Sequence, residues 1–124
     1  MTFVACLGSD VFGDQAIAGY EREGIDVSYI VRDPEAASCV ALIIVDAQGE
    51  NSIAVASGAN ARLTPDDVER AKPVIAAADV LLVQLEVPLA AVQRAIELAH
   101  GAGVRVILNP APARQIALSL LAQV

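Results

Sequence analysis

The sequence is poor in basic side chains, aromatic side chains and cysteine. Eight Lys and Arg residues stand against fifteen Asp and Glu residues, which gives a net charge of −7 at pH 7. No broad basic surface can neutralise a phosphate backbone, so we expect no nucleic acid as a partner. The two cysteines, Cys6 and Cys39, each lie within an apolar run, which favours small buried thiols over a disulfide or a metal site.

Long apolar stretches are also missing. No run approaches the roughly 18 consecutive apolar residues of a membrane span. The N-terminus lacks the basic flank and the apolar stretch of a signal peptide. We therefore expect no membrane as a partner and predict a cytoplasmic location.

Several catalytic motifs are absent from the sequence. It has no Gly-x-x-x-x-Gly-Lys-Ser/Thr loop, no Gly-x-Gly-x-x-Gly after a strand, no nucleophile elbow and no Cys/His spacing for a metal. The single histidine, His100, falls near the end of a predicted helix, where it favours a partner of the helix dipole over a base or a ligand. We find no complete catalytic constellation in these residues.

Aliphatic residues are abundant. Hydrophobic residues make up 56% of the chain and charged residues 19%. This composition is typical of buried parallel strands covered by Ala-rich helices. A chain of 124 residues has the length of one domain, so we predict a single unit over residues 1–124.

The order of apolar runs predicts alternating strands and helices. We expect strands at 2–7, 27–31, 80–85 and 104–108, a turn region at 8–13, and helices at 14–23, 64–71, 88–101 and 113–121. The strand at 80–85 reads as buried on both faces, and Pro73 is expected to end the second helix. The alternation predicts right-handed βαβ units and a Rossmann-like parallel sheet with flanking helices, an α/β fold.

One pair of strands departs from this alternation. The β-prone runs 39–45 and 52–56 are separated by residues 46–51, whose Gly and polar side chains suit a hairpin with a longer loop. We expect this pair to be antiparallel, and residues 57–60 to form the loop that follows it.

Polar residues follow several of the predicted strands, where open α/β sheets bind their ligands. These residues are Gly8-Ser9-Asp10, Gly58-Ala59-Asn60, Glu86 and Asn109. A carboxylate such as that of Glu86 can accept hydrogen bonds from sugar hydroxyls.

Each of these residues also has a structural interpretation. Glu86 can be a solvated charge near a helix N-terminus, where the helix dipole favours an acid. For Asp10 and Asp14 we favour the interpretation as loop and helix-start acids. Asn60 and Asn109 can equally be turn residues whose side chains bind nearby backbone groups.

Taken together, these segments resemble the ribokinase family of carbohydrate kinases. The segment Phe3–Gly13 is similar to the family's strand and Gly-Asp-Asp-x-x-Gly-like turn. Residues 40–45, 49–51 and 58–60 resemble its hairpin lid region, 82–89 the strand that ends in a sugar-contacting Glu, and 109–114 the segment that completes the series. The resemblance covers essentially the whole chain and favours the ribose-specific branch over the fructokinase and adenosine kinase branches.

The resemblance implies a ribokinase-like fold with a lid hairpin at about residues 38–57. It implies a sugar kinase that converts D-ribose to ribose 5-phosphate with ATP and Mg²⁺. Glu86 would hydrogen-bond the hydroxyls of the ribose, and Ala41 and Ile43 would line the sugar pocket from the lid. It also implies a homodimer formed through the lid hairpin.

The sequence departs from the family pattern in three motifs. The Asn-x-Asp sugar clamp, the Gly-Gly-Lys-Gly-Ala-Asn segment and the Gly-Ala-Gly-Asp loop with the catalytic base are all missing, and Cys39 replaces a common Gly. We therefore expect an internal fragment of the kinase, begun at an internal start codon. It would carry part of the sugar site and be inactive alone. The alternatives are a non-catalytic interaction module that pairs through its hairpin, and a fragment without function.

Overall fold

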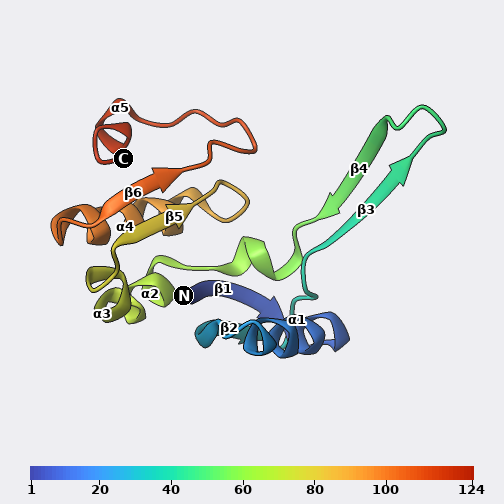
Figure 1. Ribbon diagram of the computed structural model, residues 1–124, viewed down its shortest axis with the longest axis horizontal. Helices are drawn as coiled ribbons and strands as arrows, with labels where there is room; N and C mark the ends of the chain where they lie inside the picture. Colours follow the sequence, from blue (N-terminus) through green and yellow to red (C-terminus); the bar gives the residue numbers. More distant parts are fainter.

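The structure, a computed structural model, describes all residues 1–124 and alternates strands with helices (Figure 1). The elements are β1 (Thr2–Gly8), α1 (Val11–Arg22), β2 (Asp26–Asp33), β3 (Val40–Val45), β4 (Asn51–Ala56), the 3₁₀ helix η1 (Gly58–Arg62), α2 (Pro65–Arg70), α3 (Lys72–Ala76), β5 (Val80–Val83), α4 (Leu89–Gly101), β6 (Arg105–Leu108) and α5 (Leu118–Leu121). None of the helices is long and apolar enough to span a membrane.

The strands form three separate pairs. β1 pairs with β2 and β5 pairs with β6, both in parallel, while β3 and β4 pair antiparallel. The predicted α/β class, the βαβ units and the antiparallel hairpin are therefore confirmed. The two parallel pairs do not hydrogen-bond to each other, although β1, β5 and β6 run in the same direction (Figure 1).

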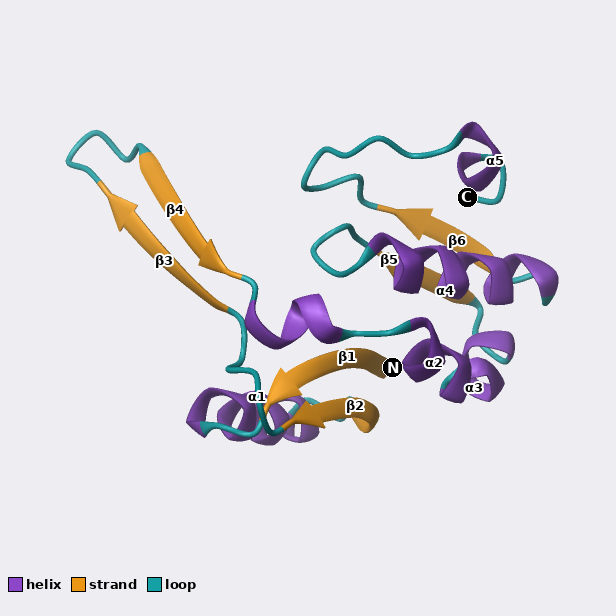
Figure 2. Ribbon diagram, turned by 180° about the vertical axis from the view of Figure 1, so that it is seen from behind, coloured by secondary structure: helices purple, strands orange, loops and turns teal.

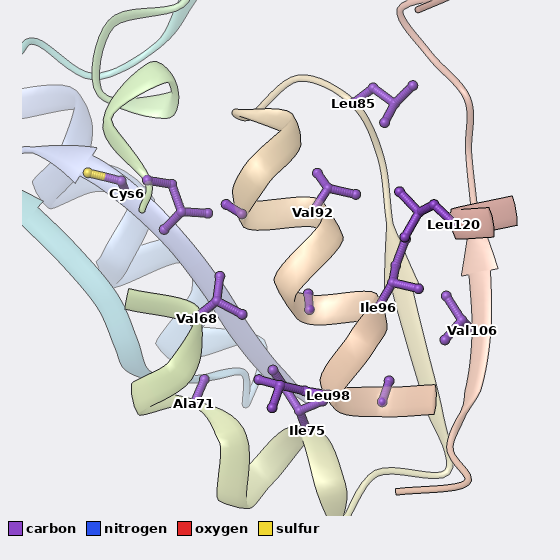
Figure 3. Packing of buried hydrophobic residues seen from close by; sticks show 14 of the residues in the cluster. Cys6, Val68, Ala71, Ile75, Leu85, Val92, Ile96, Leu98, Val106 and Leu120 are labelled. Carbon is purple, nitrogen blue, oxygen red and sulfur yellow. The ribbon is translucent and has the colours of Figure 1, made fainter. Parts of the chain in front are cut away.

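One hydrophobic core joins the two parallel pairs, with α4 at its centre. Ile96 and Ala99 on α4 are fully buried, and Val92 is nearly so. Figure 3 shows Val92 and Ile96 of α4 between Val68 and Ile75 on one side and Val106 and Leu120 on the other. The apolar stripe of α4 thus lies at the centre of this core.

Three predicted segments differ from the structure by more than small shifts at their ends. Helix α1 begins at Val11, three residues before the predicted start, because the Asp10 carboxylate caps it. Residues 57–60 are not a plain loop, since η1 begins at Gly58. The second helix, α2, ends at Arg70 before Pro73, as expected. A separate short helix that was not expected, α3, begins at Lys72 and holds Pro73 in its first turn, where a missing N–H costs little. The last helix spans only Leu118–Leu121, because residues 113–117 are mostly exposed and little packing supports a helix there.

The prediction that residues 80–85 form a strand buried on both faces is wrong. β5 ends at Val83, and only one of its faces is covered. Leu82 is 71% exposed, because no element of the chain packs over that side of β5 and β6. Leu85, beyond the strand, is buried instead.

Both cysteines are free thiols. Cys6 is buried on β1, and this burial is the main cause that raises the pKa of its thiol. Cys39 is only half-buried, just before β3. The predicted buried thiol is therefore confirmed for Cys6 and holds only in part for Cys39.

The β3–β4 hairpin stands away from the rest of the chain (Figures 1 and 2). Its register runs from Val40 opposite Ala56 to Val45 opposite Asn51. Every residue of both strands is exposed. The hairpin is therefore joined to the core only at its base.

Candidate functional site

The loops that follow β1, β5 and β6 lie at one edge of the molecule. The arrowheads of these strands point to the same side, toward the hairpin (Figure 1). This edge holds Gly8-Ser9-Asp10, Glu86 and Asn109, as the sequence predicts. It is the position at which parallel α/β proteins bind ligands.

Glu86 lies in the loop between β5 and α4. The neighbouring Leu85 is 1% exposed, and its N–H donates to the Ala111 carbonyl over 2.9 Å. The N–H of Glu86 itself donates to the side-chain oxygen of Gln84. The backbone that leads into Glu86 is therefore held at two consecutive N–H groups.

The Glu86 carboxylate itself is exposed and has no hydrogen bond or ion pair within the chain. It caps no helix, because α4 has no side-chain cap and begins three residues later, at Leu89. The arrangement presents a free carboxylate acceptor at the edge of the sheet. Such a group can accept hydrogen bonds from a ligand's hydroxyls.

Ala41 and Ile43 lie on the same face of the hairpin. They stand opposite Val55 and Ile53 on β4, so this face is apolar. Figures 1 and 2 show the hairpin apart from the loop after β5, so the structure does not bring these two residues into contact with Glu86.

Asp10 and Asp14 both have structural roles, as the sequence favours. The Asp10 carboxylate accepts hydrogen bonds from the Gly13 N–H at 2.8 Å and from Ser38. These bonds, that of Gly13 first, lower the pKa of Asp10 to about 2. Asp14 pairs with Arg32 across 2.6 Å. Both carboxylates are therefore already bound within the chain.

The structure does not support the turn interpretation, one of the two alternatives for Asn60 and Asn109. Neither the Asn60 nor the Asn109 side chain makes a hydrogen bond to a nearby backbone group, although the Asn109 N–H donates to the Val83 carbonyl at 2.9 Å. Asn109 is exposed beside the loop of Glu86. His100 lies in the last turn of α4, as predicted.

Ser38 is a residue that the sequence interpretation missed. It is 5% exposed, just before the hairpin. Its N–H donates to Asp10 Oδ2 at 2.7 Å and its hydroxyl donates to Asp10 Oδ1 at 2.8 Å. The same hydroxyl accepts the Gly8 N–H at 3.1 Å. No local sequence signal joins residues 28 positions apart, so only the fold reveals this network.

A hollow of about 640 Å³ lies elsewhere, where β2, η1 and α2 meet. Three of its charged residues already bind one another, since Arg62 pairs with Asp33 at 2.9 Å and Glu35 at 3.3 Å. The Glu35 N–H and Arg62 lower the pKa of Asp33. None of the predicted site residues lines this hollow.

The pattern that defines the family described as "pfkB family carbohydrate kinase" matches residues 1–124. The chain is 42% identical over 120 residues to a ribokinase of Staphylococcus aureus strain COL, covering 97% of this chain and 40% of that protein. It is 41% identical over 107 residues to a deoxyribokinase of Salmonella typhi, covering 86% of this chain and 35% of that protein.

Solved structures agree with these sequence relatives. The structure of a ribokinase from Giardia lamblia superposes with a TM-score of 0.84 at 31% identity, covering 97% of this chain and 38% of that one. The chain spans about 40% of the length of the curated relatives that it matches.

Proposed function

The chain belongs to the pfkB family of carbohydrate kinases, and from this premise we propose that it forms part of the sugar-binding side of a pentose kinase. The observation that carries the proposal is the free Glu86 carboxylate on a fixed loop at the carboxyl edge of the parallel strands. Ala41 and Ile43 would cover the apolar side of the sugar from the hairpin. Ribose is the first candidate substrate, because relatives that match nearly the whole chain are named ribokinase.

The proposed reaction of the whole kinase is transfer of a phosphoryl group from ATP, with a divalent metal such as Mg²⁺, to D-ribose, giving ribose 5-phosphate. The residues of this chain do not themselves fit the metal, since no three His, Cys, Asp or Glu side chains gather to hold an ion. We therefore derive no catalytic step from this chain. Its role in the proposal is to bind and orient the sugar. A cytoplasmic location belongs to the same proposal.

Isothermal titration of the purified chain with ribose tests this function. We expect ribose to bind and Glu86→Gln to weaken binding by about tenfold or more, since a hydrogen bond to a charged group contributes roughly 1.5–3 kcal/mol. Glu23→Gln is the matched control, because Glu23 is an exposed carboxylate remote from that edge. A Glu86→Gln chain that binds ribose as well as the unaltered chain would remove Glu86 from the site.

Two further titrations refine the proposal. Deoxyribose is tested beside ribose because one relative is named deoxyribokinase. ATP with magnesium is added in a coupled assay for ADP release, where we expect no turnover from this chain. Measurable turnover would contradict the proposal that this chain binds the sugar without transferring a phosphoryl group. Failure of both sugars to bind would contradict the sugar site.

A second candidate function is pairing with a second copy through the hairpin. The hairpin exposes apolar residues on both faces, including Leu42 at 63% on one and Ile43 at 57% on the other. Isolated two-stranded hairpins are only marginally stable. Its outer edges are also unpaired. Sedimentation across a range of concentrations separates this candidate from a monomeric sugar-binding chain.

A further inference from the structure

The two ends of the hairpin meet at one place in the fold. Ala37 precedes β3 and Ala59 follows β4, and the Ala59 N–H donates to the Ala37 carbonyl at 2.8 Å. This bond joins the two ends of the hairpin to each other. The orientation of the hairpin therefore depends on how this joined base is attached to the core.

The attachment runs through the carboxylate of Asp10. Its Oδ2 accepts the Ser38 N–H at 2.7 Å, and its Oδ1 accepts the Ser38 hydroxyl and the Gly13 N–H, both at 2.8 Å. Ser38 in turn accepts the Gly8 N–H at 3.1 Å. One side chain thus binds the base of the hairpin to the end of β1 and the start of α1.

Three glycines let the backbones at this point touch directly. A Cβ on Gly8 would lie 2.5 Å from the Ala36 carbonyl oxygen and from the Ser38 nitrogen. A Cβ on Gly13 would overlap the Gly8 carbonyl, and one on Gly58 would overlap the Ala37 carbonyl. Gly58 also has a φ of +48°, which favours glycine. The base of the hairpin is therefore closely packed, in contrast to its fully exposed strands.

We propose that Asp10 is a positioning residue that sets the direction of the hairpin by holding Ser38. The same carboxylate has two separate roles. It caps helix α1 through the Gly13 N–H, and it holds the base of the hairpin through Ser38. The second contact is the tether of the hairpin. The consequence for sugar binding by Ala41 and Ile43 rests on the proposed function. The position of the hairpin does not, so it is measured without sugar.

The two tasks can be separated by Asp10→Asn. Asn is as good a helix cap as Asp, but its amide group offers only one acceptor oxygen, so the Ser38 N–H would face an NH₂ group. We expect α1 to persist and the tether to be lost.

Pulsed electron spin resonance on the full chain measures the result. Spin labels at Gln48→Cys and Gln15→Cys report the distance from hairpin tip to body, and labels at Gln15→Cys and Gln93→Cys report the body alone. Cys39→Ala removes the accessible native thiol, whereas Cys6 is 2% exposed. In Asp10→Asn we expect the tip-to-body distribution to become at least twice as wide, with the body distribution unchanged.

Asp14→Asn is the matched control, because Asp14 is an acid of the same helix that binds Arg32 and not the hairpin. It should leave both distributions unchanged. An unchanged tip distribution in Asp10→Asn overturns the proposal, and equal widening of both distributions shows that Asp10 merely supports the fold.

Hydrogen exchange on the unaltered chain gives a second test that does not depend on a variant folding. We expect the amide protons of Ser38 and Ala59 to exchange at least tenfold more slowly than those of the hairpin loop at residues 46–51. Equal exchange rates would show that the base opens as readily as the tip, and would overturn the proposal.

Discussion

Ser38 is a buried polar residue whose side chain serves two partners at once. Its hydroxyl donates to Asp10 and accepts the N–H of Gly8, which is itself buried. We expect Ser38→Ala to lower the free energy of unfolding by about 1–3 kcal/mol, because the Gly8 N–H loses its partner away from water. Urea unfolding followed by circular dichroism measures this loss.

Ser28→Ala is the control for that variant. Ser28 also hydrogen-bonds an Asp, at 2.6 Å, but it is exposed on β2. Its replacement should change stability by no more than about 0.5 kcal/mol. Equal losses in the two variants would mean that burial of the Ser38 network has no effect on stability.

The lowered pKa of Asp10 predicts that the chain becomes less stable in acid. The pKa of its carboxyl is lowered to about 2 in the folded chain by the Gly13 and Ser38 hydrogen bonds, against roughly 3.9 for an unfolded Asp. A lowered pKa means that the stabilisation is complete above about pH 4 and is lost as the pH falls toward 2. The charged side chains beside this network are Arg32 and Asp14, which pair with each other.

Unfolding measured between pH 5 and pH 2 tests this dependence. The Asp10→Asn chain cannot take up the proton, so its stability should fall less steeply over that window than that of the unaltered chain. Asp26, Asp33 and Glu97 also have lowered pKa values and supply the slope that remains. Identical slopes in the two chains would contradict the assignment.

Some residue roles could be predicted from the sequence, and others could not. Asp10 and Asp14 are recognisable as helix-start acids, because capping depends on neighbours within a few positions. Ser38 is not recognisable, because its partner lies 28 residues away. That Glu86 contributes to a sugar site follows from family resemblance and stays a prediction, since an exposed carboxylate after a strand has the same local pattern with or without a ligand.

At the scale of elements, the two faces of the hairpin carry different residues. Ala41, Ile43 and Val45 share one face with Ile53 and Val55. Val40, Leu42 and Ile44 share the opposite face with Ala54 and Ala56. The first face includes both proposed sugar-contacting residues, which leaves the second for a partner.

We predict opposite effects of a lysine on these two faces. Ile43→Lys should weaken ribose binding about tenfold in titration and leave the sedimentation mass unchanged. Leu42→Lys should reduce association between copies about tenfold and leave ribose binding unchanged. If both variants weaken ribose binding, or both reduce association between copies, the two faces of the hairpin do not serve separate roles.

Elements with a strong local signal could be predicted well, and elements that depend on distant packing could not. Thr64 and Pro65 mark the start of α2, and the capping box between Thr64 and Asp67 is present. The apolar stripe of α4 is likewise buried as its spacing predicts. By contrast, the apolar run of β5 gives no sign that one face is left uncovered, because apolar composition does not record which neighbours are present.

At the scale of the whole molecule, the uncovered side of β5 and β6 exposes several apolar side chains, with Arg105 at one end opposite Val80. Val80, Leu82 and Ile107 lie on this side and are 44%, 71% and 48% exposed. Proteins seldom leave large apolar patches in contact with water. The chain spans about 40% of the length of its curated relatives.

We predict that this surface binds an apolar dye. Replacing Leu82 and Ile107 together by Gln should lower the fluorescence of bound anilinonaphthalene sulfonate at least twofold, because these two side chains stand opposite each other on the patch. Val11→Gln is the control, since Val11 is 60% exposed but lies on α1, away from this surface. Unchanged dye fluorescence in the double variant would show that the patch is not accessible in solution.

The tethered base gives the hairpin the mechanics of a lever. Six residues of strand reach about 20 Å at roughly 3.3 Å per residue, while the fulcrum is a few ångströms of hydrogen bonds around Ser38. A tilt of about 10° at this fulcrum would carry the far end of the strands roughly 3.5 Å, about the rise of one residue along a strand. A small shift in position beside Asp10 therefore becomes a larger displacement at the far end of the hairpin. A shift of the same size at the tip moves only the tip.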